Sequence, residues 1–205
     1  MKIKNICLLL SVLIFAICAP VDAGEIHEAV KAGDIEKVKA MVDNDPALLY
    51  SKDELGKTPL HWAAGRDQLE IMRLLLDTYH VDVNVRNNNN GTPLHVSASQ
   101  AHPDAAKILI QHNATIDART KDNATPLHFA ALKTKAGHLE VAKILIQNGA
   151  DVNARMNNGA TPLAMALHSG NQEMAQLLRA SGAKQQGKSG SGRTTASAAM
   201  GLDSD

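Results

Sequence analysis

The chain has 205 residues, which is enough for one globular domain or one repeat array with terminal extensions. Its 21 basic and 21 acidic side chains cancel, so the overall charge does not point to nucleic acid or to an anionic membrane. Aromatic residues make up only 2% of a composition that is 44% hydrophobic. The interior must therefore be built from aliphatic side chains and alanine, which suits thin layers of helices better than a thick core.

The N-terminal segment has the layout of a bacterial-type secretory leader, and we predict a signal peptide at residues 1–23. Two lysines are followed by an apolar run over 6–19 and by small residues before a cut after Ala23. A retained membrane anchor is the alternative, but a spanning helix needs about 20 apolar residues. Cys7 and Cys18 both lie in this segment, so the mature chain would contain no disulfide. We expect export to the periplasm or the secreted space, without membrane association after cleavage.

Residues 24–55 contain two short helical patterns, which together run from Ile26 to Val42. Their apolar residues recur at helical spacing, and their outer face is charged. No Thr-Pro pair precedes either helix. This segment therefore differs from the four copies of a motif that follow it.

The tetrapeptide Thr-Pro-Leu-His occurs three times, and a fourth copy ends in alanine. The copies begin at Thr58, Thr92, Thr125 and Thr161, at spacings of 34, 33 and 36 residues. Threonine is a good N-cap and proline fits the first helical position, so each copy predicts the start of a helix. A second helical pattern follows each copy, as in Leu69–Leu76.

The position two residues before each threonine supports one repeated backbone. It is occupied by Gly56, Asn90, Asn123 and Gly159. Glycine and asparagine are the residue types that tolerate a positive φ at low cost. We therefore predict a sharply turned loop in front of each of these helices.

Two of the repeats contain insertions. The third has three extra residues within 132–136, between its two helices, and the first has one extra residue near Tyr79 and His80, after its second helix. We predict that both lie in connections, where additional chain costs little free energy.

This pattern resembles the ankyrin repeat, a unit of 33 residues with a T-P-L-H start. The resemblance extends to Gly-His-Leu-Glu-Val-Ala-Lys-Ile-Leu-Ile at 137–146 and Asn-Gly-Ala-Asp-Val-Asn-Ala at 148–154, and it covers roughly residues 25–183. It implies an all-α solenoid of stacked helix pairs with short hairpin-like loops, about four repeats and an N-terminal cap. The predicted boundaries are a cap at 24–55, repeats at 56–89, 90–122 and 123–158, a C-terminal cap repeat at 159–183 and a disordered tail at 184–205.

Three histidines, His61, His95 and His128, occupy the same place in successive repeats and invite a metal hypothesis. Zinc ligands must lie about 2 Å from one ion, whereas neighbouring helices are about 8–10 Å apart. We therefore predict that each histidine bonds the start of its own helix, and we expect no metal and no cofactor. Motifs for a nucleophile, a phosphate loop or a zinc protease are missing from the sequence, so no enzymatic activity is expected.

The resemblance implies recognition of another protein, and not of nucleic acid, by a chain that we expect to be monomeric. The candidate partner-binding residues at the loop tips are Glu54, Leu55, Lys57, Asn88, Asn89, Lys121, Asp122, Asn157 and Asn158. Those on the inner helices are Arg66, Gln100, Leu132, Lys133 and His168. Leu55 and Leu132 are apolar at positions expected to be exposed, which makes them the best anchors. Because aromatic residues are few, we expect a moderate affinity.

The leading hypothesis is a periplasmic or secreted module that shields or assembles a partner protein. A secreted effector that binds a host protein is the alternative, with 184–205 contributing to its delivery. A metal-binding or enzymatic protein is a further alternative, which would require a chemical motif that the sequence does not contain.

Overall fold

The computed structural model describes residues 23–184, and every regular element within that range is a helix. The predicted all-α fold class is therefore confirmed. The predicted leader and the predicted tail lie outside the described residues, apart from Ala23 and Lys184. Within 23–184 no helix combines the length and the apolar character needed to cross a membrane.

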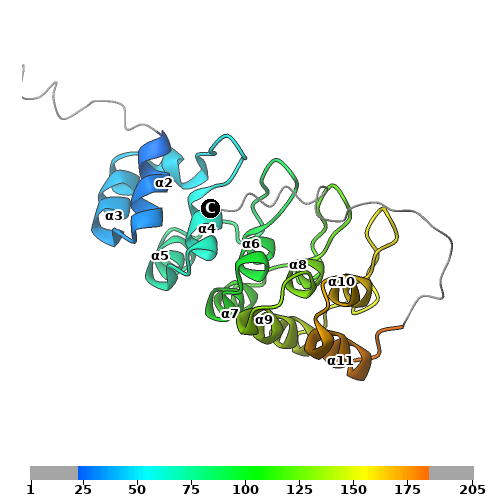
Figure 1. Cartoon of the computed structure of the whole chain (residues 1–205). Coiled ribbons are helices and arrows are strands. Elements are labelled where there is room, and N and C mark those ends of the chain that lie inside the picture. Colours follow the sequence, from blue (N-terminus) through cyan, green and yellow to red (C-terminus); the bar gives the residue numbers. More distant parts are fainter. Residues whose placement is uncertain (1–22, 185–205) are drawn as a thin grey trace, which may run out of the picture.

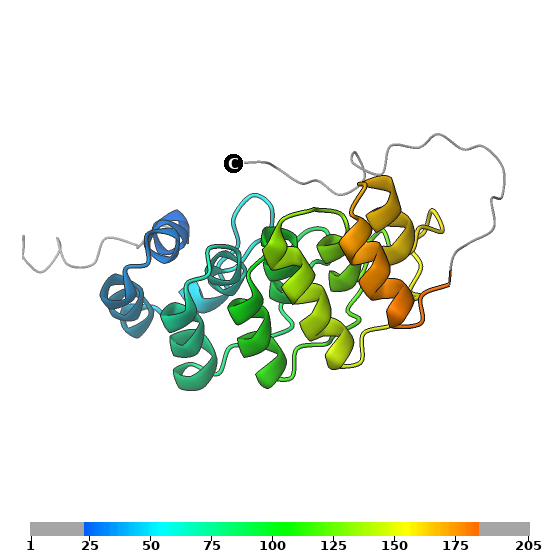
Figure 2. The same cartoon turned by 60° about the horizontal axis from the view of Figure 1, so that its bottom comes forward.

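The helices are arranged in two rows, and the loops project from one of them to the same side (Figures 1 and 2). The inner row, next to the loops, consists of α2 (Ala23–Ala32), α4 (Pro59–Gly65), α6 (Pro93–Gln100), α8 (Pro126–Ala131) and α10 (Pro162–His168). The outer row consists of α3 (Ile35–Asn44), α5 (Leu69–Arg73), α7 (Pro103–Gln111), α9 (Ala136–Gln147) and α11 (Gln172–Ala180). A 3₁₀ turn, η1 (Pro46–Tyr50), connects α3 to the first loop.

The inner helices α4, α6, α8 and α10 begin where the tetrapeptides predict. Thr58 is the N-cap of α4 with an extended backbone, and Pro59 takes the first helical position. In the first three repeats the threonine N–H donates to Nδ1 of the histidine three residues later, at 3.2, 3.1 and 3.1 Å. In the fourth, the Thr161 hydroxyl accepts from the backbone N–H of Ala164 at 3.2 Å. Each helix start is therefore closed by its own side chains.

The loops turn as the glycines and asparagines predict. Their φ angles are 72° at Gly56, 58° at Asn90, 62° at Asn123 and 79° at Gly159. At Gly56 a Cβ atom would lie 2.7 Å from the backbone nitrogen of Asn88 in the next loop. The first of these positions therefore requires glycine for close approach as well as for its backbone angle.

The insertion in the first repeat is accommodated differently from our expectation. It does not lie in a connection, because the outer helix continues as one π-helical turn, η2 (Leu74–Thr78). The backbone N–H of Tyr79 donates to the Leu74 carbonyl at 3.2 Å, a bond that spans five residues and takes up the extra one. The insertion in the third repeat does lie in a connection, since α8 ends at Ala131 and α9 begins at Ala136.

The core is one continuous layer between the two rows. The leucine of each tetrapeptide is almost completely buried, as are its outer-helix partners; the leucines are Leu60, Leu94, Leu127 and Leu163. The alanine pairs Ala63–Ala64 and Ala130–Ala131 have no exposed surface, and their small side chains allow the two rows to approach closely.

Three histidines bond each repeat to the next. Because Nδ1 accepts from the threonine N–H, the ring proton lies on Nε2, which donates to the carbonyl just before the following threonine. These bonds run from His61 to Gly91 at 3.0 Å, from His95 to Ala124 at 3.2 Å and from His128 to Ala160 at 3.2 Å. His27 occupies the same place in the cap and lies 3.2 Å from the Ser51 carbonyl. The predicted bond to the helix start is present, and a second bond between repeats accompanies it.

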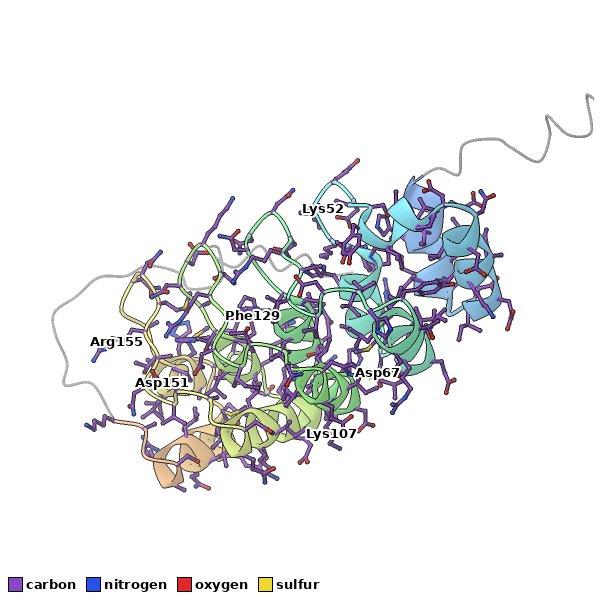
Figure 3. All side chains as sticks on the ribbon, turned by 180° about the vertical axis from the view of Figure 1, so that it is seen from behind. Lys52, Asp67, Lys107, Phe129, Asp151 and Arg155 are labelled. Carbon is purple, nitrogen blue, oxygen red and sulfur yellow. The ribbon has the colours of Figure 1, made fainter. Side chains whose placement is uncertain are left out.

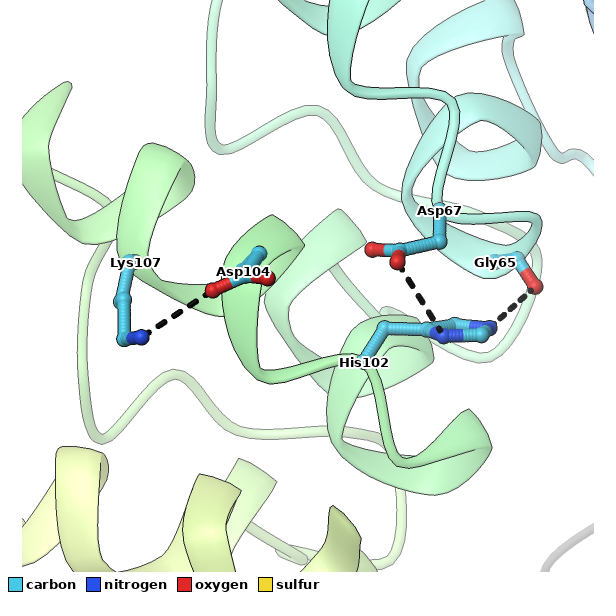
Figure 4. A network of polar contacts seen from close by, with 5 residues as sticks. All are labelled: Gly65, Asp67, His102, Asp104 and Lys107. Atoms are coloured by element: carbon cyan, nitrogen blue, oxygen red, sulfur yellow. Dashed lines mark hydrogen bonds and ion pairs between the residues drawn. The ribbon is translucent and has the colours of Figure 1, made fainter.

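A second set of polar side chains bonds in the opposite direction. Each lies just before an outer helix or in its first turn, and donates to a carbonyl at or just after the end of the inner helix of the preceding repeat. The bonds run from Gln68 to Lys31, from His102 to Gly65, from His138 to Ser99 and from Asn171 to Lys133, at 3.4, 3.1, 3.1 and 3.0 Å. Figure 4 shows His102 between the Gly65 carbonyl and the Asp67 carboxylate. Carbonyls at helix ends, which have no partner within the helix, are satisfied in this way.

Burial keeps the three histidines that bond the next repeat neutral. Removal from water lowers the pKa of His61, His95 and His128 to about 4, against 6.5 for a free imidazole. Burial also lowers the pKa of His138. A protonated Nδ1 could not accept the threonine N–H, so charging any of the three rings would break its helix cap.

We expect replacement of Leu127 by alanine to lower the free energy of unfolding by about 2–5 kcal/mol, because it leaves a cavity in a completely packed layer. Leu94→Ala should behave alike, since both side chains are at most 1% exposed. Urea denaturation followed by circular dichroism measures the loss. Leu55→Ala is the control, because that side chain is 44% exposed. Buried variants as stable as the control would contradict the assigned core.

We expect the fold to lose stability as the pH falls from 6.5 toward 4. The unfolded chain binds protons on His61, His95 and His128 at a higher pH than the folded chain does. The stabilisation is therefore complete above pH 6.5, and about 3 kcal/mol per histidine is lost by pH 4.

Urea denaturation over this pH range tests the expectation, with His95→Gln as the comparison. That variant should be less stable at neutral pH but should lose less stability on acidification, because one proton fewer is bound on unfolding. His112 acts in the opposite direction, since the Ile108 carbonyl and the Asp77 carboxylate raise its pKa. Equal losses in parent and variant would show that burial does not hold His95 neutral.

Candidate functional site

The candidate partner-binding residues lie along the loops and the inner helices, and none of them is buried. We call this side of the array the loop face. Its exposed members are Glu54, Leu55, Arg66, Asn88, Gln100, Lys121, Asn157, Asn158 and His168. Its half-buried members are Lys57, Asn89, Asp122, Leu132 and Lys133. The sequence therefore predicted positions that solvent reaches, while their role in binding stays a prediction.

Two of the predicted loop-tip side chains bond neighbouring loops. The Asn88 side-chain amide donates to the Glu54 carbonyl at 2.9 Å, and Asn157 donates to the Lys121 carbonyl at 2.9 Å. Backbone bonds accompany them, for example from Asn88 N–H to the Leu55 carbonyl at 3.0 Å. These asparagines fix the spacing of the loops.

A row of basic side chains joins successive loops below their tips. Each donates to a carbonyl of the next loop: Lys52 to Arg86 at 3.1 Å, Arg86 to Arg119 at 3.0 Å and Arg119 to Arg155 at 3.1 Å. Lys52 and Arg155 mark the two ends of this row on the loop side, whereas Lys107 lies on the helical side (Figure 3). Our sequence reasoning missed this row, although a basic residue recurring at the repeat spacing was a visible signal.

Trp62 is the second feature that sequence reasoning missed. It is half-buried on α4, and three cations surround its ring: the Lys31 Nζ is 4.0 Å, the Lys57 Nζ 4.6 Å and the Arg66 Cζ 6.0 Å from the ring centroid. Contacts of this length between cations and an aromatic ring are attractive. The low number of aromatic residues predicts few binding hot spots, but it does not show that one of these residues lies on the loop face.

Asp53 fixes the Trp62 ring and the loop tip together. One carboxylate oxygen accepts the Trp62 Nε1–H at 3.0 Å. The other accepts the backbone N–H groups of Leu55 at 3.0 Å and of Lys57 at 2.7 Å. One carboxylate thus holds an exposed leucine and a lysine in place beside the tryptophan.

The two apolar anchor candidates differ in the structure. Leu55 is 44% exposed at the first loop tip, and Tyr50, five residues earlier in the sequence, is 50% exposed at the end of η1. Leu132 is half-buried and packs against the core at the end of α8. Exposed apolar surface is therefore concentrated at the N-terminal end of the loop face.

Charge is divided between the two sides of the four repeats. The loops and inner helices carry the loop-face cations Lys52, Lys57, Arg66, Arg86, Arg119, Lys121, Lys133 and Arg155, against the acids Asp53, Glu54 and Asp122. The outer helices and the segments after them carry the outer acids Glu70, Asp77, Asp82, Asp104, Asp117, Glu140, Asp151 and Glu173, against Arg73, Lys107, Lys143, Arg179 and Lys184. A chain with almost no net charge therefore has two sides of opposite sign.

No metal-binding cluster is found in the part of the chain that the structure describes: nowhere in 23–184 do three His, Cys, Asp or Glu side chains converge as ligands would. Among the histidines, His61, His95 and His128 are engaged in the bonds between repeats. The loop face instead offers hydrogen-bonding groups, cations and the Trp62 ring over a broad area. Such a surface suits contact with a macromolecule.

Comparison with known proteins agrees with this geometry. The 26S proteasome non-ATPase regulatory subunit 10 of Dictyostelium discoideum is 32% identical over 90 residues, 44% of this chain and 39% of that protein. The human transient receptor potential cation channel subfamily A member 1 is 33% identical over 101 residues, which are 49% of this chain and 9% of that protein. Alpha-latrocrustotoxin-Lt1a of Latrodectus tredecimguttatus is 33% identical over 121 residues, 58% and 8%.

The chain spans less than half the length of these curated relatives, and their names have nothing in common. The family model described as ankyrin repeats (3 copies) matches residues 26–122 and 116–189, a range that includes every helix from α3 to α11. With the stacked helix pairs and their projecting loops, this match shows that the chain belongs to the ankyrin-repeat family.

Proposed function

We propose that this chain is a protein-binding module of the periplasm or the secreted space, which shields or assembles a partner protein through its loop face. Ankyrin repeats are protein–protein interaction modules, and the family is typically non-enzymatic. The observation that carries the proposal is that two sets of polar side chains differ in what they contact. Those between repeats bond backbone carbonyls of the neighbouring repeat, whereas most of the candidate residues on the loop face are exposed to solvent on loops that such bonds hold in place.

Rigidity of the loop face supports this function. Binding costs free energy when side chains and loops must be ordered, and a surface that is ordered beforehand avoids part of that cost. The asparagine bonds between loop tips and the basic row below them provide this order. Location in the periplasm or outside the cell rests on the leader-like sequence at residues 1–23.

Site-specific photocrosslinking in the native organism tests the binding surface. A benzoylphenylalanine replaces Leu55 or Gln100 on the loop face, or Lys107 or Lys143 on the outer helices, all of which are exposed. We expect one discrete protein adduct from the loop-face positions, and none from the outer positions. Adducts of equal yield from both sides, or none from the loop face, would contradict the proposal.

Export is tested by fusing alkaline phosphatase, which is active only outside the bacterial cytoplasm, to the C-terminus. We expect an active fusion with the full chain and an inactive one when residues 1–23 are deleted. Mass spectrometry of the secreted or periplasmic product should give an N-terminus at Gly24. A fusion that is inactive with the full chain, or a product that retains Met1, would contradict export with cleavage.

A further inference from the structure

The loop-face cations form no ion pairs within residues 23–184. The ion pairs among residues 23–184 involve Lys31, Lys37, Lys107, Lys143 and two histidines. They lie on the cap, on the outer helices and in the connections next to these helices. None of them includes a loop-face cation. Where Lys52, Arg86 and Arg119 do bond, they bond backbone carbonyls and keep their charge. The loop face therefore carries more cations than acids, since only Asp53, Glu54 and Asp122 lie among the eight loop-face cations.

The positive field is focused around Trp62. Lys31, Lys57 and Arg66 converge on its ring. Two acids lie beside them: Glu28 pairs with Lys31 at 2.8 Å, and Asp53 accepts the Trp62 Nε1–H at 3.0 Å. The three cations exceed these two acids by one charge, so the cluster still attracts an arriving anion. The exposed Leu55 lies next to the cluster and adds apolar surface. One end of the array thus presents an anchor that combines positive charge with exposed apolar surface.

We propose that the partner recognised by the loop face presents an acidic polypeptide segment, whose carboxylates pair with Lys57 and Arg66 beside Trp62 and with the cations of the following loops. This inference rests on the proposed protein-binding function and specifies the chemistry of its partner. Complementary charge of this kind raises the association rate and excludes wrongly charged partners. The outer acids repel the same segment, so only one side of the array attracts it.

A polypeptide fits this face better than a nucleic acid does. Duplex DNA carries one phosphate charge per about 1.7 Å of its axis, so its charges cannot avoid acidic side chains within a binding surface. Asp53, Glu54 and Asp122 lie among the loop-face cations. A peptide can place its carboxylates between these acids and can set apolar side chains against Leu55, because its charges are separated and its side chains vary.

Trp62 supplies the measurement, because it is the only tryptophan in the chain and lies inside the anchor. Its fluorescence is titrated with poly-L-glutamate, and with poly-L-lysine and duplex DNA as comparison polymers. We expect a saturable change with poly-L-glutamate that weakens as salt is added, and no saturable change with poly-L-lysine. Tighter binding of DNA than of poly-L-glutamate would overturn the assignment to an acidic polypeptide.

Two matched variants separate the anchor from charge in general. Lys57→Gln with Arg66→Gln removes two cations beside Trp62, and Lys107→Gln with Lys143→Gln removes two from the outer helices. We expect the first pair to weaken poly-L-glutamate binding about tenfold and the second to change it less than about twofold. Thermal unfolding checks that both remain folded. Equal effects of the two pairs would overturn the proposal.

The native partner gives an independent result. In the photocrosslinking experiment, adding Lys57→Gln and Arg66→Gln should strongly reduce the adduct formed from position 100, whereas adding Lys107→Gln and Lys143→Gln should leave its yield unchanged. If the adduct persists in the Lys57→Gln and Arg66→Gln variant, the proposed protein-binding function still stands, but the proposal that the partner presents an acidic segment is overturned. If the chain without these substitutions forms no adduct from any loop-face position, the binding function itself is contradicted.

Discussion

Stability of this array depends on the hydrogen bond from each buried imidazole to the carbonyl that precedes the next helix. His61, His95 and His128 use one nitrogen to close their own helix and the other to hold the following repeat. Local folding and stacking are therefore coupled through a single neutral side chain. Each repeat contacts only its neighbours, so the array has no deep core like that of a globular domain. Three features must replace it: these histidine bonds, the bonds that run in the opposite direction from the outer helices, and the continuous leucine layer.

Much of the fold could be predicted because it is encoded locally. Thr-Pro marks a helix start, and Gly56 or Asn90 marks a positive φ, whatever surrounds them. The π-turn at Leu74 could not be foreseen, because an extra residue can be placed in a helix or in a loop and packing decides between them. The bonds made by His102 and His138 to the previous repeat depend on which residues the stack brings opposite one another, and a single sequence does not state this.

The candidate surface shows the same division. Positions such as Gln100 and Asn158 follow from the repeat register, since the register fixes which side chains leave the framework. Trp62 was missed because its importance comes from Lys31 in the preceding unit and from Asp53 in the loop, neither of which the register connects to it. Net charge misled in a similar way: it sums over both sides of the array, whereas a partner meets only one side at a time.

The fourth tetrapeptide ends in Ala164, and this small change has a consequence for how long the array can be. Within 23–184 no further helix pair follows α11, so an imidazole at this place would direct a proton donor toward water. Alanine removes the donor, and the Thr161 hydroxyl alone closes the helix. The last described unit thus lacks the side chain that bonds the other three repeats to the next one. Duplicating a middle repeat would therefore keep the histidine bond, whereas a copy appended beyond α11 would need a histidine at position 164 to form it.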